Sequence, residues 1–199
     1  MPPRKTILAF LVRFVLLFAL LAAPWPGVKS ATGGYFRALC RSVFSADDGR
    51  RELSFETPGA DSPRPDDTRV VIVNKALMNP DGSGPVRNLD VGFGWQAVAL
   101  LLALIFATPI PWKRKAWALV WGLLGIHCFL LLFLALCIWT ESAEISLVVL
   151  SPFWKAIAIA VQEVLKGQLD LAAPILIWVL ATFRRGDLAP RGKLVPSAR

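Results

Sequence analysis

Four long apolar segments, separated by polar stretches, constrain this chain more than any other feature. They run over about 6–23, 95–109, 117–139 and 169–183. Apolar segments of this kind cross a bilayer as helices, because every backbone N–H and C=O then bonds within the segment. The mean hydropathy of +0.55 and the 55% share of hydrophobic residues exceed those of a typical soluble domain. The sequence therefore predicts a mainly α, polytopic membrane protein.

Basic residues indicate the orientation of the segments across the membrane. Lys113-Arg114-Lys115 lies between the second and third segments, and Arg4 and Lys5 precede the first. Loops rich in Lys and Arg stay on the cytoplasmic side. The tail after the last segment is also basic, through Arg184, Arg185, Arg191, Lys193 and Arg199. With all of these on one side, the prediction is four transmembrane helices with both termini cytoplasmic.

The formal net charge of +8 and the eight tryptophans fit this placement. In a membrane protein such a charge faces anionic lipid, and indole rings favour the headgroup layer where apolar runs end. The sequence has no nucleic-acid recognition motif and no basic patch interleaved with aromatic residues. The expected partner is therefore membrane lipid, and no nucleic acid is expected.

Residues 145–183 admit two interpretations. Two apolar runs lie here, and the first contains Pro152, Lys155 and Glu163. If both runs cross the membrane, the chain has five spans and its basic tail lies outside. The distribution of Lys and Arg favours four spans, with residues 151–166 forming a helix in the outer interface.

Residues 1–24 share a basic start and an apolar run with signal peptides. However, Ala22-Ala23-Pro24 is a poor cleavage site, because proline follows the small residues directly. The run also approaches the length that spans a bilayer. We therefore expect an uncleaved first transmembrane helix rather than a signal peptide.

Residues 25–93 are polar and irregular, and they are predicted to form an extracytoplasmic loop. Apolar residues at 3–4 spacing over Gly34–Phe44 indicate an amphipathic helix on the membrane surface. Strands are predicted where polar and apolar residues alternate or where the residues are mostly β-branched. The three stretches of this kind are Glu52–Glu56, Arg69–Asn74 and Val86–Val91. Turn-forming residues separate the stretches, so we expect a small antiparallel β-sheet. Residues 94–199 then hold the later helices and the tail.

Cys40 and His127 are the two candidates for catalytic residues. His127 lies near the centre of the third segment, where an ionisable side chain is a functional candidate. Cys40 lies outside the apolar segments, with Arg37 and Arg41 near enough to lower the pKa of its thiol. A thiol nucleophile needs a base within hydrogen-bond reach, but these two residues are expected at different membrane depths. Structural packing is the favoured interpretation of both, and no catalytic residue is assigned.

No metal or cofactor is expected. His127 has no accompanying ligand cluster, and the three cysteines imply no disulfide framework. The sequence also lacks phosphate-binding loops, dinucleotide fingerprints, serine elbows and HExxH patterns.

Two further patterns concern packing. Gly122 and Gly125 lie three residues apart in the third segment, where small residues permit close approach of another helix. A charged cluster is also expected near the outer face, where it would form local ion pairs at a solvated interface or line a polar entrance. It consists of Glu141, Glu144, Glu163 and Asp170, with Lys155 and Lys166 among them.

The stretch from Arg69 to Lys115 carries a resemblance to a known family. The strand Arg69–Asn74 leads through a polar turn to the apolar helix Leu100–Pro109, which closes with Pro111-Trp112-Lys113-Arg114-Lys115. This arrangement resembles the small integral membrane proteins that accompany bacterial exosortase systems. The resemblance implies a bacterial inner-membrane protein with an accessory role in the sorting or processing of envelope proteins. Exosortases themselves use a cysteine, an arginine and a histidine near the outer face, but that site is not transferred to Cys40 and His127.

The sequence thus supports a non-enzymatic accessory protein whose extracytoplasmic loop binds a larger membrane protein or an envelope protein. A membrane-embedded thiol peptidase or transpeptidase is the first alternative, and it would depend on Cys40 and His127. A small transporter subunit is the second alternative. The scarcity of charges within the spans, which hold Arg13 and His127, disfavours a conduction path.

Overall fold

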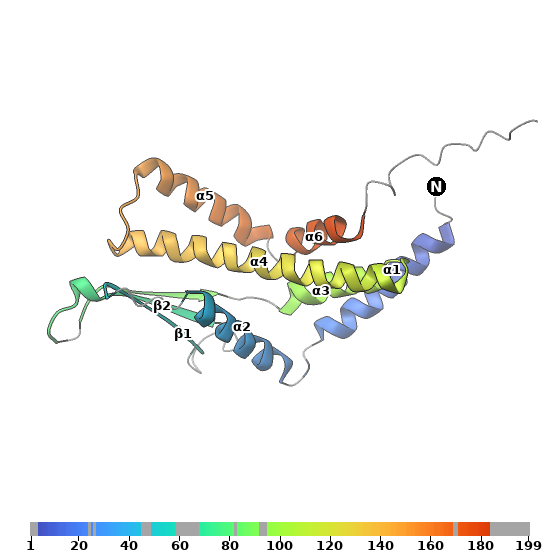
Figure 1. Ribbon diagram of the computed structural model, residues 1–199, viewed down its shortest axis with the longest axis horizontal. Coiled ribbons are helices and arrows are strands. Elements are labelled where there is room, and N and C mark those ends of the chain that lie inside the picture. The colour runs from blue at the N-terminus through green and yellow to red at the C-terminus, as the bar shows by residue number, and fades with distance from the viewer. Residues whose placement is uncertain are drawn as a thin grey trace, which may run out of the picture.

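The computed structural model has one long central helix, with a helical bundle at one end and a small sheet at the other (Figure 1). It describes residues 4–23, 25, 27–44, 49–58, 68–81, 83–91, 95–168 and 171–183. The basic tail from Arg184 onward lies outside these residues, so its predicted cytoplasmic location has no structural counterpart here. The elements in chain order are α1 (Arg4–Ala22), α2 (Val28–Phe44), β1 (Arg51–Glu56), β2 (Thr68–Asn74), η1 (Lys75–Leu77), β3 (Val86–Val91), α3 (Trp95–Ala107), α4 (Trp112–Glu144), α5 (Pro152–Gln168) and α6 (Ala172–Thr182).

Helix α4 is the spine of the molecule. Its 33 residues make it about 50 Å long at 1.5 Å per residue, which is longer than the predicted segment 117–139. Pro111 precedes its first turn, where a missing N–H has no cost. The helix ends where Ile145 leaves helical geometry and Ser146 adopts a positive φ of 59°. We call residues 112–127 its proximal half and residues 128–144 its distal half.

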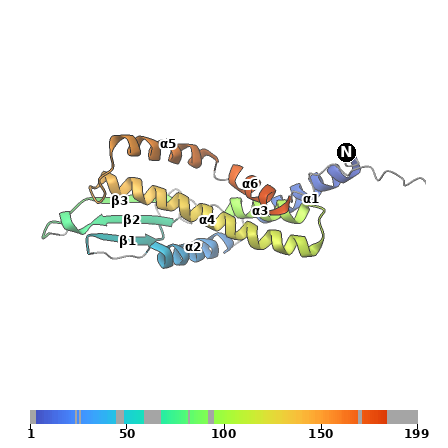
Figure 2. The ribbon, with the colours of Figure 1, turned by 45° about the horizontal axis from the view of Figure 1, so that its top comes forward.

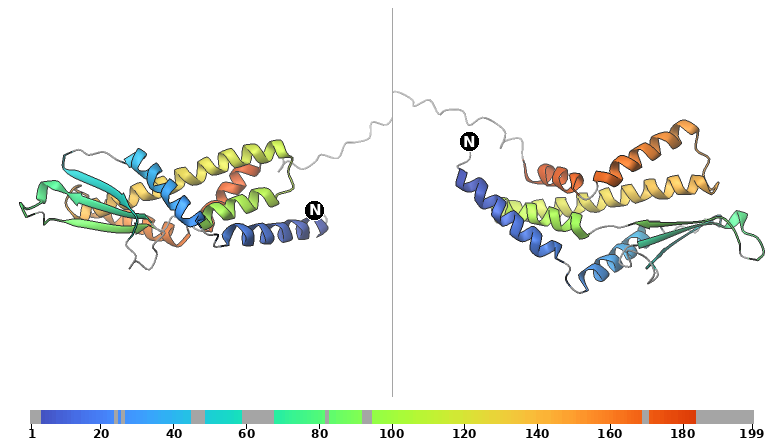
Figure 3. Two further views of the ribbon diagram at one scale, coloured as in Figure 1. Left: turned by 90° about the horizontal axis from the view of Figure 1, so that it is seen from below. Right: turned by 180° about the vertical axis from the view of Figure 1, so that it is seen from behind.

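Helices α1, α3 and α6 gather at the proximal half of α4 (Figures 1 and 3). Close approach depends on the two glycines of α4. A Cβ added at Gly122 would lie 3.1 Å from Cδ1 of Ile105 in α3, and one at Gly125 would lie 3.2 Å from Cγ2 of Ile177 in α6. The prediction that small residues bring helices together is confirmed at both positions.

Polar contacts of two tryptophans fix the bundle. The indole of Trp178 in α6 donates to Oγ1 of Thr108 at 2.9 Å, and its ring stacks on Phe10 of α1 with centroids 6.2 Å apart. Trp95, the first residue of α3, donates its indole N–H to the carbonyl of Leu21 near the end of α1. Helix α1 is thus part of this packing, and its uncleaved state stays a prediction.

Among the residues that the structure describes, two helices are long and apolar enough to cross a membrane, namely α1 over Lys5–Ala22 and α4 over Trp112–Glu144. Helices α3 and α6 are apolar, but they have only 13 and 11 residues. Those lengths correspond to about 20 and 17 Å, against about 30 Å of hydrocarbon. Pro109 and Pro111 stop α3, because proline lacks the N–H that a helix needs and disfavours helical geometry in the preceding residue. The membrane character is therefore supported, whereas four transmembrane helices are not confirmed.

The predicted sheet is confirmed and has the order β1-β2-β3, with both pairs antiparallel. Figure 2 shows the three strands side by side, next to the distal half of α4. Every second residue of β2 is buried, because one face of the sheet packs on α2 and α4. That covered face belongs to a core formed by Phe55, Val70 and Ile72 of the sheet with Cys40 of α2 and Ile138 of α4.

Helices α2 and α5 flank the distal half of α4 (Figure 3). The amphipathic helix predicted over Gly34–Phe44 exists and begins earlier, at Val28. Helix α5 confirms the helix predicted over 151–166, and it runs back along α4, since Oγ1 of Thr140 donates to Oε1 of Gln162 at 3.1 Å. Its predicted position in the membrane interface stays a prediction.

Candidate functional site

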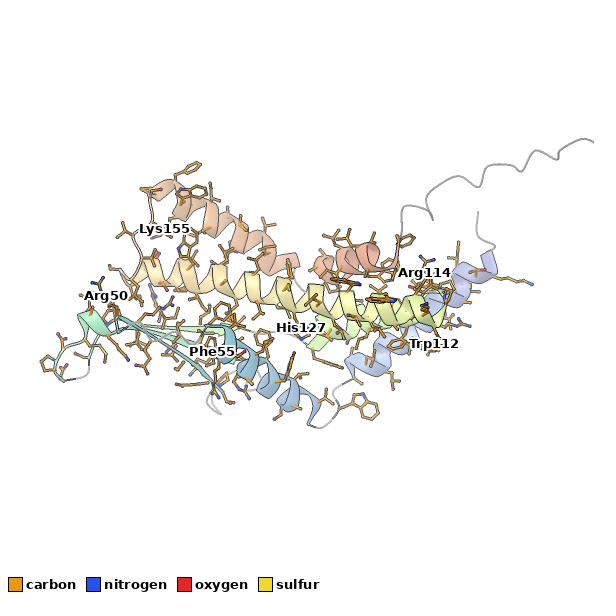
Figure 4. The ribbon with its side chains drawn as sticks, in the orientation of Figure 1. Arg50, Phe55, Trp112, Arg114, His127 and Lys155 are labelled. Atoms are coloured by element: carbon orange, nitrogen blue, oxygen red, sulfur yellow. The ribbon has the colours of Figure 1, made fainter. Side chains whose placement is uncertain are left out.

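A pocket of about 320 Å³ lies where α2, α3 and α4 meet, and we call it the junction pocket. Figure 4 shows its histidine, His127, between the bundle and the sheet. The lining is mostly apolar and aromatic, which suits an apolar ligand group fixed by few polar contacts. The residues that line it are Thr32, Tyr35, Phe36, Trp95, Val98, His127 and Leu130.

Helix periodicity explains this lining. Thr32, Tyr35 and Phe36 follow one another at spacings of three and one, so they share one side of α2. His127 and Leu130 are three residues apart and share one side of α4. The pocket therefore forms where these two helix faces meet the first turn of α3.

His127 has a defined tautomer. Its Nδ1 lies 2.7 Å from the carbonyl oxygen of Leu123, one turn earlier in α4. A carbonyl oxygen only accepts, so Nδ1 carries the hydrogen in this contact, which in the neutral form of the ring leaves the lone pair on Nε2. The ring of Tyr35 meets the imidazole edge to face, with centroids 5.7 Å apart. The histidine can thus accept one hydrogen bond at Nε2 from a hydroxyl or amide group.

His127 lies at the middle of α4, in agreement with its expected place near the centre of the third segment. It also lies beside Trp95 at the start of α3 and contacts Tyr35 of α2, a helix within the predicted loop 25–93. Its depth in a membrane stays a prediction.

Cys40 does not join His127 in the junction pocket. The thiol is fully buried, in the core between α2 and the sheet, together with Phe55 and Val70. Burial raises the pKa of Cys40 to about 12, because the surrounding apolar groups cannot solvate a thiolate. Cys40 follows Tyr35 by five residues, which places them about 140° apart around α2.

The expected lowering of the thiol pKa by Arg37 and Arg41 is wrong, since the pKa is raised. Nη2 of Arg41 donates to the carbonyl of Phe55 in β1 at 2.6 Å, so this guanidinium binds the sheet. The structure therefore provides no thiolate and no pairing of Cys40 with a base. These facts disfavour a thiol nucleophile.

The face of the sheet opposite the covered face is exposed, and we call it the open face. Val71 and Val73 of the central strand lie there, half-buried, and Val86 beside them is 45% exposed. Strand pairing places Val73 opposite both Glu52 and Val86. The three valines thus form a small apolar strip with polar neighbours. The open face is made of Glu52, Ser54, Val71, Val73, Val86 and Asn88.

An ionic cluster holds the sheet against the end of α4. Arg87 of β3 lies 3.8 Å from Glu141 and 3.9 Å from Glu144, and Lys155 of α5 lies 2.7 Å from Glu144. Within the predicted charged cluster, the ion pair of Glu144 with Lys155 is confirmed, and Asp170 lies outside the described residues. The contribution of Arg87 was not predicted. The two-residue period of a strand places Arg87 on the same covered side of β3 as Leu89, and an arginine at such a position signals an ionic partner.

A buried hydrogen bond reinforces the same contact. Asn74 at the end of β2 donates from Nδ2 to the carbonyl of Ile145 at 2.8 Å, and its Oδ1 accepts from the N–H of Ala76. The Nδ2 group therefore joins the sheet to the end of α4, whereas Oδ1 caps η1, which directly follows β2.

In the part of the chain that the structure describes, no group of three or more His, Cys, Asp or Glu residues is placed to hold a metal ion. Comparison with protein-family models, curated proteins and solved structures finds no match to this chain.

Proposed function

We propose that this chain is a non-enzymatic accessory protein of a bacterial inner membrane that supports the sorting or processing of envelope proteins. Its sheet would bind an extracytoplasmic segment of a larger membrane protein or of an envelope protein. One observation carries the proposal: the sheet is fixed to α4 through its covered face and leaves its open face exposed.

The surface of α4 supports a membrane location for its proximal half. Large apolar side chains that are more than a third exposed are spread along this helix as far as Trp139. Beyond that point the helix makes polar contacts, through Thr140, Glu141 and Glu144. An apolar exposed surface suits lipid, and Trp139 suits the headgroup layer. With the basic cluster of Lys113 inside, the sheet lies on the outer side.

The open face has the chemistry of a docking surface. Valine side chains there retain exposure in a sheet whose other face packs on α2 and α4, so a partner that covers them would bury apolar area. The strip is smaller than about 800 Å² per partner, which is typical of a stable interface. We therefore expect a transient contact, or a partner that also uses the exposed apolar side chains of α5, such as Phe153 and Val164.

A thiol peptidase is less well supported. It requires Cys40 to ionise beside a base, but the thiol is buried with a raised pKa and His127 lines a different site. A transporter subunit would require a polar path through the bundle, and no observation favours that function over docking.

Site-specific photocrosslinking in intact cells tests the proposal. A photoreactive residue at position 71, on the open face, is expected to give a discrete crosslinked product with an envelope or membrane protein. Val43, which is 53% exposed on α2 and outside the sheet, provides the matched control position. No such product is expected from position 43.

A substitution then checks that the open face itself is responsible. Val73→Lys puts a charge in the centre of the strip, and it should abolish the product formed from position 71 while membrane insertion is unchanged. Val43→Lys should leave the product intact. Equal crosslinking from positions 71 and 43, or a product that survives Val73→Lys, would show that the open face is not a docking surface.

A further inference from the structure

A second groove lies at the opposite end of the molecule, between α1 and the end of α3. Its volume is about 270 Å³, and we call it the α1–α3 groove. It is lined by Lys5, Thr6, Ala9, Phe10, Arg13, Ala107 and Pro109. The groove thus combines two cations and one hydroxyl with an apolar wall, and none of its lining residues is acidic.

The cations lie on one side of α1. Lys5, Ala9 and Arg13 are spaced by four residues, so they form a row along the helix, with the small side chain of Ala9 between the two charges. The two Cα atoms of Lys5 and Arg13 are about 12 Å apart along the helix axis. Long basic side chains can close most of that gap, which leaves room for one anionic group between them.

Arg13 has no acidic partner among the residues that the structure describes. It is exposed in the middle of an apolar helix, and no described carboxylate lies within ion-pair distance of it. An arginine at the centre of a membrane helix is unfavourable unless its charge reaches the interface or a counterion. Each Cβ on a helix is tilted toward the helix N-terminus, so Arg13 leans toward Lys5 and the basic end of the bundle.

The shortness of α3 makes this position accessible. Because α3 ends at Ala107, no further turn of α3 covers the first turns of α1. Pro109 lines the groove at that place instead. The basic cluster that begins at Lys113 lies at the same end of the molecule. A phospholipid of the cytoplasmic leaflet can therefore insert its headgroup between α1 and the end of α3.

We propose that the α1–α3 groove binds the phosphate of an anionic phospholipid from the cytoplasmic leaflet. Lys5 and Arg13 contact the phosphate oxygens, Thr6 donates a hydrogen bond, and Phe10 contacts the upper part of an acyl chain. This inference depends on membrane insertion, which the proposed function also assumes, but it is independent of docking at the open face.

Lipid exchange in reconstituted vesicles tests the proposal. The full chain is reconstituted in vesicles of phosphatidylcholine and phosphatidylglycerol, extracted in mild detergent, and its retained lipid is measured by mass spectrometry. We expect phosphatidylglycerol to be enriched over its share in the vesicles. Lipid held only by general surface charge exchanges with detergent, so retained lipid reports the direct contact. Loss of one charge-assisted hydrogen bond to the phosphate lowers affinity about tenfold, so Arg13→Gln should reduce the enrichment about tenfold.

Lys113→Gln is the matched control, since Lys113 is an exposed cation at the same end of the molecule but outside the groove. It should leave the enrichment unchanged, whereas Arg13→Lys should retain most of it. A separate arm adds inorganic phosphate to the lipid-loaded chain in detergent. Retention of phosphatidylglycerol in excess phosphate identifies the lipid as the ligand, and its complete displacement would mean a site for free phosphate.

If a variant does not fold, the phosphatidylglycerol enrichment of the wild-type chain alone tests the proposal. A retained lipid mixture with the composition of the vesicles would overturn the proposal. An enrichment that falls equally in Arg13→Gln and Lys113→Gln would overturn it too, because it would reflect general surface charge. Neither result bears on crosslinking at position 71, so failure here is distinguishable from failure of the docking proposal.

Discussion

Cys40 is expected to be nearly unreactive in the folded chain, and its reactivity tests how the sheet is packed. Cys128→Ser with Cys137→Ser leaves Cys40 as the sole thiol. Burial raises the pKa of Cys40 from 9.0 to about 12. That change lowers the thiolate fraction near neutral pH by about a thousandfold. Alkylation by N-ethylmaleimide should therefore be at least about a thousandfold slower in the folded than in the denatured chain, with mass spectrometry as the readout.

The pH dependence follows from the same shift. The folded thiol stays neutral up to about pH 12, whereas the unfolded thiol ionises from about pH 9. The stability that the buried thiol provides is thus present below pH 9 and is lost as the pH rises from 9 toward 12. A control variant that carries Leu77→Cys as its sole thiol, at the 53% exposed end of η1, should react at similar rates in both states. Rapid labelling of Cys40 at neutral pH in the folded chain would refute the packing and reopen the thiol peptidase alternative.

Two further substitutions probe the contacts at the two ends of α4, and both are measured by thermal unfolding of the purified chain in detergent. Gly122→Leu should destabilise the bundle by about 1–3 kcal/mol, because a Cβ there already meets Ile105 at 3.1 Å. Gly34→Leu is its control, since a Cβ at Gly34 meets only a flexible arginine tip at 3.9 Å, and an equal loss would count against close packing. Asn74→Ala should cost about 1–3 kcal/mol, because it leaves a buried carbonyl without its donor. Asn88→Ala on the open face should change stability by less than about 0.5 kcal/mol, and similar losses in both would contradict the buried bond.

The sheet could be predicted from the sequence almost to the residue. Strand β3 was expected at Val86–Val91 and is found there, and β2 extends the predicted Arg69–Asn74 by one residue. These strands carry a local signal, because alternating or β-branched residues are bounded by turn formers. The order and the pairing also follow from the short connections, which favour antiparallel neighbours.

The lengths of the later helices could not be predicted in the same way. Hydropathy marks where apolar residues lie, but it does not show where a helix continues into polar sequence. Helix α4 therefore runs past Trp139 to Glu144 and begins before the predicted Trp117. The contact between Arg87 and the acidic end of α4 joins residues more than fifty positions apart. No local pattern encodes such a partner.

The candidate sites depend on these same lengths. Cys40 and His127 could be named as candidates from the sequence by residue type. The structure separates them, because helix periodicity places Tyr35, not Cys40, on the side of α2 that meets His127. The α1–α3 groove gave no sequence signal beyond Arg13 in an apolar run. A groove needs two helix surfaces, and their relative positions follow only from tertiary packing.

The short helix α3 explains why both cavities exist. At 13 residues it covers only part of the neighbouring helices α1 and α4. At its first residue, Trp95, the uncovered part of α4 meets α2 and forms the junction pocket. Beyond its last residue, the uncovered part of α1 exposes Arg13 and forms the α1–α3 groove. Extending α3 by two turns at either end would add about 11 Å of helix and fill the adjacent cavity. The proline pair at 109 and 111 therefore limits the length of the bundle and keeps the α1–α3 groove open.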